Sequence, residues 1–243
     1  MTTYTVPEIL NEARTHYCAG CGHGILHRLV AEVIDEMGLR EEAIGVAPVG
    51  CAVIAYEYLN FDMSEAAHGR APAVATGIKR SLPDKLVFTY QGDGDLLAIG
   101  CTELIHAANR GENITIFFAN NNVYGMTGGQ MAPTTLEGQK TLTTPSGRNI
   151  KDTGHPIDAM KLLENFQSVV FLARGILTSP KEIAKTKSYI RKAFEIQQQG
   201  IGFSMVEVLS QCPTYWRMTP VNALKHIEQT VTKQFPTGIF KDI

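Results

Sequence analysis

The chain has 243 residues, of which 44% are hydrophobic, and its formal net charge at pH 7 is −2. A chain of this length and composition can bury a full globular core. The charge balance argues against nucleic-acid binding, and no run of 18 or more apolar residues predicts a membrane span. Met1 to Leu10 carry neither a charged n-region nor an apolar h-region, so we expect no signal peptide and a cytoplasmic protein.

In chain order, the hydrophobic patterns predict helices that alternate with strands. Residues 1–24 are predicted to be a loop, and apolar residues recur at helical spacing over 25–37. The further predicted helices cover 52–59, 71–80, 96–109, 158–166, 180–199 and 220–234, and the predicted strands cover 43–48, 85–91, 113–119, 168–173 and 204–209. This alternation predicts an α/β fold, a mostly parallel sheet with helices on both faces. No linker interrupts the pattern, so residues 1–243 are expected to form a single domain.

Two polar motifs follow neighbouring predicted strands. Gly92-Asp93-Gly94 ends the strand at 85–91, and Asn120-Asn121 ends the strand at 113–119 after 25 intervening residues, 95–119. Because the carboxyl ends of parallel strands meet at one edge of a sheet, the two motifs are expected to lie together. Asp and Asn oxygens suit Mg²⁺, and glycines let backbone N–H groups approach phosphates at a helix N-terminus. The pair resembles the thiamine diphosphate motif, a GDG followed by NN.

Other glycine motifs do not fit. A dinucleotide fingerprint that starts at Gly92 requires glycine at position 97, where Leu97 stands, and no P-loop sequence occurs. Gly92-Asp93-Gly94 alone would also fit a tight turn with an acidic N-cap, so the matched asparagines carry the interpretation.

Four of the five cysteines are placed where ligands are expected. Cys18 and Cys21 form a C-x-x-C in the N-terminal loop, and Cys51 and Cys212 each follow a predicted strand. If these strands share one parallel sheet, four thiolates converge beside the diphosphate site. Their spacing leaves both a zinc ion and a 4Fe–4S cluster open. Cys101 lies inside a predicted helix and is expected to be a core residue.

The stretch from Tyr124 to Pro156 is polar, rich in Gly, Thr and Pro, and predicted to be irregular. Loops of that length are usually functional or contact a partner. The resemblance to thiamine enzymes gives a second reason, since those enzymes need one domain for the diphosphate and another for the pyrimidine. The chain is long enough for one of them, so another polypeptide is expected to supply the second.

Together the motifs resemble the β subunit of 2-oxoacid:ferredoxin oxidoreductases, in the branch acting on 2-oxoisovalerate or 2-oxoglutarate. The matching segments are 16–24, 50–51, 67–70, 91–95, 120–130 and 210–214. The resemblance implies oxidation of a 2-oxoacid with CoA to acyl-CoA, CO₂ and reduced ferredoxin. It implies thiamine diphosphate, Mg²⁺ and a 4Fe–4S cluster as cofactors. The implied partners are an α subunit with the pyrimidine-binding domain and a catalytic Glu, a γ subunit, a ferredoxin-like subunit and ferredoxin.

The same resemblance assigns site residues. The implied cluster ligands are Cys18, Cys21, Cys51 and Cys212, and the implied Mg²⁺ ligands are Asp93, Asn121 and the carbonyl of Val123. The residues implied to contact the cofactor are Gly50, Cys51, His68, Gly92, Asp93, Gly94, Asp95, Asn121, Val123, Gly125, Met126 and Thr127.

His68 and Arg70 are the expected catalytic residues, although Arg70 fits a structural salt bridge equally well. The other histidines singled out are expected to be surface or capping residues: His23, His27, His106, His155 and His226. Gly128 stands where some 2-oxoglutarate-using relatives carry Lys, which favours an apolar, branched 2-oxoacid unless the partner subunit supplies a cation.

Two other functions remain open at the level of sequence. A non-oxidative thiamine-dependent decarboxylase subunit would leave Cys18, Cys21, Cys51 and Cys212 unexplained. An α/β binding protein stapled by zinc would use the same cysteines without catalysis. A brown protein would indicate iron–sulfur, and a colourless one would indicate zinc or no metal.

Overall fold

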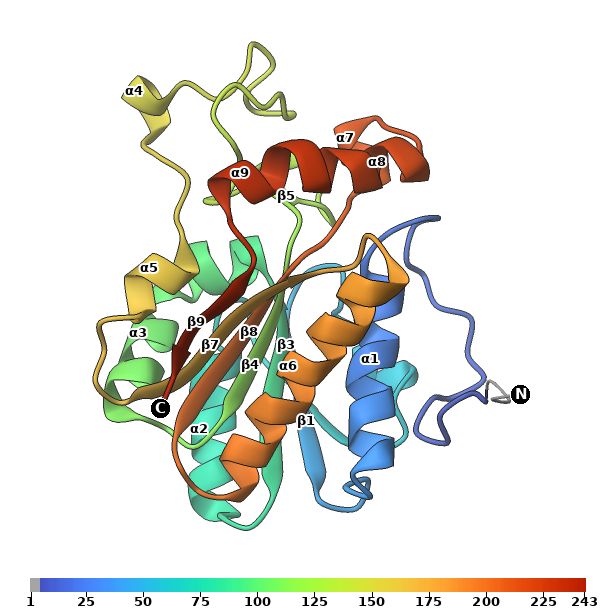
Figure 1. Ribbon diagram of the computed structural model, residues 1–243, viewed down its shortest axis with the longest axis vertical. Coiled ribbons are helices and arrows are strands. Elements are labelled where there is room, and N and C mark those ends of the chain that lie inside the picture. The colour runs from blue at the N-terminus through green and yellow to red at the C-terminus, as the bar shows by residue number, and fades with distance from the viewer. Residues whose placement is uncertain (1–4) are drawn as a thin grey trace.

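A computed structural model describes residues 5–243, so the first four residues of the predicted N-terminal loop lie outside it (Figure 1). The centre is a seven-stranded sheet of order β2-β1-β3-β4-β8-β7-β9. Its strands are β1 (Ala43–Ala47), β2 (Asp62–Glu65), β3 (Leu86–Gly92), β4 (Thr115–Asn120), β7 (Val169–Ile176), β8 (Phe203–Leu209) and β9 (Gly238–Asp242). Every pairing is parallel except that of β9 with β7. The predicted α/β fold with a mostly parallel sheet is confirmed.

Helices cover both faces of the sheet. The α-helices are α1 (His23–Glu36), α2 (Ala71–Ser81), α3 (Cys101–Arg110), α4 (Ile150–Thr153), α5 (Ala159–Leu163), α6 (Pro180–Gln198), α7 (Pro213–Trp216), α8 (Pro220–His226) and α9 (Thr232–Gln234). A 3₁₀ turn covers Ala55–Glu57, and π-helical turns cover Asp95–Ile99 and Ile227–Val231. In Figure 1, α1 and α6 pack on one face of the sheet and α2 and α3 on the other, while α7, α8 and α9 lie beyond one end of the strands. None of the helices within 5–243 is long and apolar enough to cross a membrane.

The central strands are apolar because helices cover both of their faces. All residues of β4, and all of β3 except Gly92, are buried. This is the pattern of parallel strands in a doubly covered sheet. Phe88, Phe117 and Phe194 pack in the core on the α1/α6 side, and Ile116 and Phe118 pack in the core on the α2/α3 side. The carboxyl ends of β3 and β4 are thereby held side by side, with Gly92 opposite Ala119 in the register.

Several elements differ from the prediction. The predicted helix at 52–59 is a set of turns, because this segment pairs instead with the N-terminal stretch through a bridge between Leu10 and Leu59. Strands β2 and β9 were not predicted. Both lie at sheet edges, and neither shows the apolar alternation that marks a half-buried strand. The predicted helix at 158–166 shortens to α5.

The long polar loop is ordered around one side chain. Regular structure within it is limited to the short hairpin of β5 (Val123–Tyr124) with β6 (Gln130–Met131) and to the single turn α4. Arg148 is 4% exposed and donates hydrogen bonds of 2.6–3.5 Å to carbonyl oxygens on both sides of it in sequence. The carbonyls belong to Ala132, Pro133, Thr135, Thr153, Gly154 and His155. The loop is therefore a folded surface despite its lack of helix and strand.

Candidate active site

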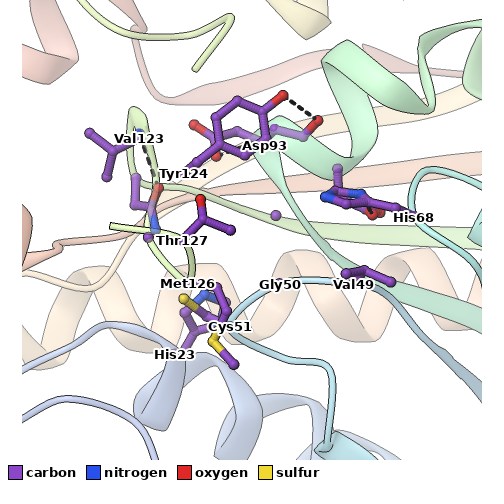
Figure 2. Close-up of a pocket in the computed structure, with 15 residues that line it drawn as sticks. His23, Val49, Gly50, Cys51, His68, Asp93, Val123, Tyr124, Met126 and Thr127 are labelled. Carbon is purple, nitrogen blue, oxygen red and sulfur yellow. Dashed lines mark hydrogen bonds and ion pairs between the residues drawn. The ribbon is translucent and has the colours of Figure 1, made fainter. Parts of the chain in front are cut away.

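One cavity opens where the predicted motifs meet. It is lined by His23, Val49 and Tyr124 and by all twelve residues assigned to the cofactor from the sequence. Those twelve are Gly50, Cys51, His68, Gly92, Asp93, Gly94, Asp95, Asn121, Val123, Gly125, Met126 and Thr127. Figure 2 shows Cys51 and His23 together at one end of the cavity and Asp93 and Tyr124 at the other. The carboxyl ends of β3 and β4 supply the central part of this wall. The structure thus brings together around one cavity the residues that the resemblance assigned to the cofactor.

Asp93 is a buried carboxylate at the end of β3. It is 1% exposed, its Oδ1 accepts a hydrogen bond from the Gly94 N–H (2.9 Å), and its Oδ2 accepts one from the Thr134 hydroxyl. Burial raises the pKa of Asp93 to about 7, although the hydrogen bonds from Thr134 and Gly94 act in the opposite direction. Because a buried carboxylate is costly to ionise by itself, a bound cation strongly stabilises its charged form. The environment of Asp93 therefore fits a divalent metal ion.

The asparagines after β4 form a strained turn. Asn122 adopts φ +60°, a left-handed conformation that residues other than glycine seldom take. The side chain of Asn121 caps the turn, since its Oδ1 accepts a hydrogen bond from the Val123 N–H (3.2 Å). The carbonyl of Asn121 accepts a hydrogen bond (2.9 Å) from the indole N–H of Trp216, the single tryptophan of the chain. Backbone and side chain of the turn are thus both held in place next to the cavity.

The oxygen atoms at this edge fit Mg²⁺. Asp93 offers a carboxylate, Asn121 an amide oxygen and Val123 a carbonyl, all of them hard ligands. Residues 5–243 contain no group of three or more His, Cys, Asp or Glu that could hold a metal ion. The Mg²⁺ set does not need such a group, because two of its three ligands are an amide and a backbone carbonyl.

The two glycines of the motif have different roles. A Cβ at Gly94 would lie 2.2 Å from the ring of Tyr124, whose hydroxyl donates a hydrogen bond to the Gly94 carbonyl (3.2 Å). A Cβ at Gly92 would meet no atom within 4 Å. Gly94 therefore permits close packing within the protein, whereas Gly92 leaves open space on the cavity side for a ligand.

His68 is held against a buried acid. Its Nδ1 lies 2.5 Å from Asp95 Oδ1, and Asp95 in turn accepts hydrogen bonds from the Gly69 N–H (2.8 Å) and the Gln91 amide (2.6 Å). With Nδ1 against Asp95, the Nε2 atom is the ring nitrogen available to a ligand. Arg70 does not line the cavity and pairs with Glu103 of α3. The structure gives Arg70 the structural salt bridge that the sequence also allowed, and its catalytic role stays a prediction.

The four motif cysteines line a second cavity beside the first. Cys18, Cys21, Cys51 and Cys212 surround it, and it shares Cys51, Asn121, Gly125 and Met126 with the first cavity. All five cysteines are free thiols, and Cys101 lies apart in α3. Burial, and then the neighbouring thiols, raise the pKa of Cys51 and Cys212 to about 12. Buried thiols are costly to ionise without a cation, and all four line one cavity. As they are placed within residues 5–243, however, they do not form a group that could hold a metal ion, so the cluster on these cysteines stays a prediction.

Several residues of the site were not predicted as such. His23 and His27, expected to be surface or capping residues, are 2% and 5% exposed, so that expectation was wrong. His23 lines the first cavity with its Nδ1 3.0 Å from the Tyr90 hydroxyl, and burial lowers the pKa of both histidines to about 4. Thr134 and Trp216 were also missed. Their contacts join residues 41 and 95 positions apart, and no local pattern reports such contacts.

Comparison with known sequences identifies the family. Residues 48–208 match the family described as thiamine pyrophosphate enzyme, C-terminal TPP binding domain. Ketoisovalerate oxidoreductase subunit VorA of Methanothermobacter thermautotrophicus is 52% identical over 228 residues, which are 94% of this chain and 48% of that protein. 2-Oxoglutarate synthase subunit KorB of Archaeoglobus fulgidus is 38% identical over 220 residues, which are 90% of this chain and 78% of that protein. The chain therefore spans about half the length of the VorA relative and most of the KorB relative.

Comparison with solved structures agrees. The 2-oxoglutarate:ferredoxin oxidoreductase of Magnetococcus marinus, solved with 2-oxoglutarate, coenzyme A and succinyl-CoA bound, matches with a TM-score of 0.82 and 25% identity. The match covers 100% of this chain and 86% of that chain. A thiamine diphosphate-dependent 4-hydroxybenzoylformate decarboxylase of Rhodococcus jostii, at 16% identity and a TM-score of 0.53, shares the fold alone. On these matches and the site geometry, the chain belongs to the thiamine diphosphate-binding subunits of the 2-oxoacid:ferredoxin oxidoreductase family.

Proposed function

We propose that the chain serves an enzyme that oxidises a 2-oxoacid with CoA to acyl-CoA and CO₂ and passes the electrons to ferredoxin. The observation that carries this proposal is the shared wall of the two cavities, formed by Cys51, Asn121, Gly125 and Met126. A site that releases electrons and a site that accepts them would then be immediate neighbours. The relatives act, by their names, on ketoisovalerate and 2-oxoglutarate. Gly128 and the higher identity to VorA favour the branched substrate.

Residues of this chain have distinct tasks in the proposed reaction. Asp93, Asn121 and the Val123 carbonyl would hold Mg²⁺, and the open space beside Gly92 would admit the diphosphate. Thiamine diphosphate supplies, when bound, the carbanion chemistry that releases CO₂ from a 2-oxoacid. His68, held by Asp95, would present Nε2 to the substrate. Cys18, Cys21, Cys51 and Cys212 would hold a 4Fe–4S cluster.

The remaining parts are proposed to come from partner subunits. An α subunit would supply the pyrimidine-binding domain and the Glu that activates the cofactor, and a γ subunit and a ferredoxin-like subunit would complete the enzyme. The ordered loop around Arg148 is the proposed docking surface, with Met126 and Leu142 53% and 63% exposed there. All five cysteines are free, as is usual in a reducing cytoplasm, where we propose the enzyme works.

The central test removes one proposed Mg²⁺ ligand from the chain purified with its co-expressed partners. Asp93→Ala and Asn121→Ala should each abolish Mg²⁺-dependent retention of thiamine diphosphate while far-UV circular dichroism stays unchanged. Asp84→Asn, at an exposed position, is the matched control and should retain the cofactor. Normal cofactor content in either alanine variant would refute the assignment of the motif.

Activity tests the rest of the proposal. The complete complex should reduce viologen only with both a 2-oxoacid and CoA, and this chain alone should not. Robust turnover by the isolated chain would refute the requirement for a partner. A colourless protein that contains zinc would refute the cluster.

A further inference from the structure

A buried ion-pair system lies behind the asparagine turn. Arg174 in β7 and Glu207 in β8 are register partners, 0% and 1% exposed, with Arg174 Nε 2.7 Å from Glu207 Oε2. Arg174 also pairs with Asp158, and its guanidinium lies over the rings of Phe235 and Phe240 at 5.2 and 5.1 Å. Burying charges within a sheet is costly even when they are paired, so stability alone is a poor explanation for this system.

The second oxygen of Glu207 connects the ion pair to the turn. Glu207 Oε1 accepts a hydrogen bond from Asn120 Nδ2 (2.7 Å) at the end of β4. Because an ionised carboxylate only accepts, Asn120 must direct its NH₂ group to Glu207 and its Oδ1 away from it. That Oδ1 accepts hydrogen bonds from the Asn122 N–H (3.2 Å) and the Asn122 side-chain amide (3.0 Å).

The hydrogen bonds continue to the acidic residue of the site. The Asn122 amide also donates to the Thr134 carbonyl (3.0 Å), and the Thr134 hydroxyl donates to Asp93. Asn122 is the residue with φ +60°, and it separates Asn121 from Val123. The left-handed turn that presents these two proposed ligands is therefore held by an amide whose orientation Glu207 dictates.

We propose that Glu207 is a positioning residue of the metal site, which orients Asn120 so that the 120–123 turn presents its ligands. The proposal rests on the proposed Mg²⁺ and thiamine diphosphate function. Arg174 has a supporting part, since its charge favours the ionised Glu207 that can accept on both oxygens.

The hydrogen-bond chemistry makes a specific prediction. Glu207→Gln keeps the shape but offers one acceptor and one donor, so it cannot accept from both Arg174 and Asn120. If Asn120 rotates to suit the new NH₂ group, its own NH₂ group meets two donors of Asn122. Asn120→Asp alone places two carboxylates against each other. In the double variant the new NH₂ group at position 207 donates to the new carboxylate at position 120, which still accepts from Asn122, so every contact again pairs a donor with an acceptor. The double variant also has the same net charge as wild type.

The test uses the chain purified with its co-expressed partners and measures thiamine diphosphate retention by equilibrium dialysis against rising Mg²⁺. Glu207→Gln and Asn120→Asp should each raise the Mg²⁺ concentration for half-maximal retention about 10- to 100-fold, as for other residues that support metal ligands. The double variant should return to within about threefold of wild type. Asp158→Asn removes one carboxylate that pairs with Arg174 and does not alter the contacts of Asn120. This variant should lower the unfolding temperature and leave the Mg²⁺ requirement within about threefold of wild type.

Three results would overturn the inference alone, provided that wild type shows Mg²⁺-dependent retention. They are an unchanged Mg²⁺ requirement in Glu207→Gln, a double variant no better than the single ones, and an equal loss in Asp158→Asn. A wild-type complex without Mg²⁺-dependent retention would overturn the proposed function and this inference with it.

Discussion

A single methyl group added at Gly125 is expected to remove the iron–sulfur cluster and spare the fold. Gly125 lies in the shared wall of the two cavities, and a Cβ there would lie 3.0 Å from Cys51 Sγ and 3.6 Å from Asn121 Nδ2. Heavy atoms pack favourably at about 3.5–4.0 Å, so the Cys51 sulfur must move by about half an ångström or more. Gly125 is not among the residues with positive φ, so its backbone accepts alanine without strain.

The cost to stability should be small because the displaced atom is the free end of a side chain. Overpacking by one methyl group costs typically about 1–3 kcal/mol, and we expect the lower end, which corresponds to a fall of about 2–4 °C in Tm. Cluster content should respond far more strongly, since Cys51 would no longer meet the geometry of the other three thiolates.

Iron and acid-labile sulfide per chain, after anaerobic purification, measure the effect directly. Gly77→Ala in α2 is the matched control, because a Cβ there meets no atom within 4 Å. This control should keep its iron and should not lose stability. A Gly125→Ala protein with full iron content would show that Cys51 is not a ligand or that the wall is not shared as described.

Cysteine, histidine and arginine variants test the other assignments. Cys212→Ser should lose cluster iron and Cys101→Ser should keep it, and equal iron in both would refute that division of the cysteines. Burial lowers the pKa of His27 from 6.5 to about 4, so its contribution to stability is complete above pH 6.5 and is lost as the pH falls toward 4. Urea denaturation should show that the unfolding free energy falls less between pH 7 and 4 in His27→Gln than in wild type, by up to about 3 kcal/mol. The control His106→Gln, at an exposed position, should fall as wild type does. Equal pH dependence in wild type and His27→Gln would contradict this. Arg148→Lys keeps the charge but cannot reach all six carbonyls, so trypsin should cut the 124–156 loop much faster than in Arg217→Lys. Equal rates would refute the role of Arg148.

The residues that sequence could predict are those with local signals. The Asp93 and Asn121 motifs each follow an apolar run, and parallel pairing of β3 with β4 brings them together as expected. Helix α6 was also predictable, since Ser179 caps its first turn and Pro180 starts it. Where the pattern lies within one element, its period and its end signals suffice.

The residues that sequence missed have distant partners. His23 is buried because it meets Tyr90, 67 positions away, and the segment at 52–59 failed to form a helix because Leu59 pairs with Leu10. Arg174 and Glu207 did offer a signal, as charged residues within apolar strands. Only the register of β7 with β8 shows that these two charges face each other.

The way in which Arg148 binds its loop has an evolutionary consequence. Every hydrogen bond that its side chain makes in the loop goes to a backbone carbonyl, a group that each amino acid possesses. Mutations at the exposed residues Thr153 or His155 can therefore alter the outward chemistry of the loop without removing the acceptors that fold it. The surface is free to diverge along with a partner while one arginine preserves its shape.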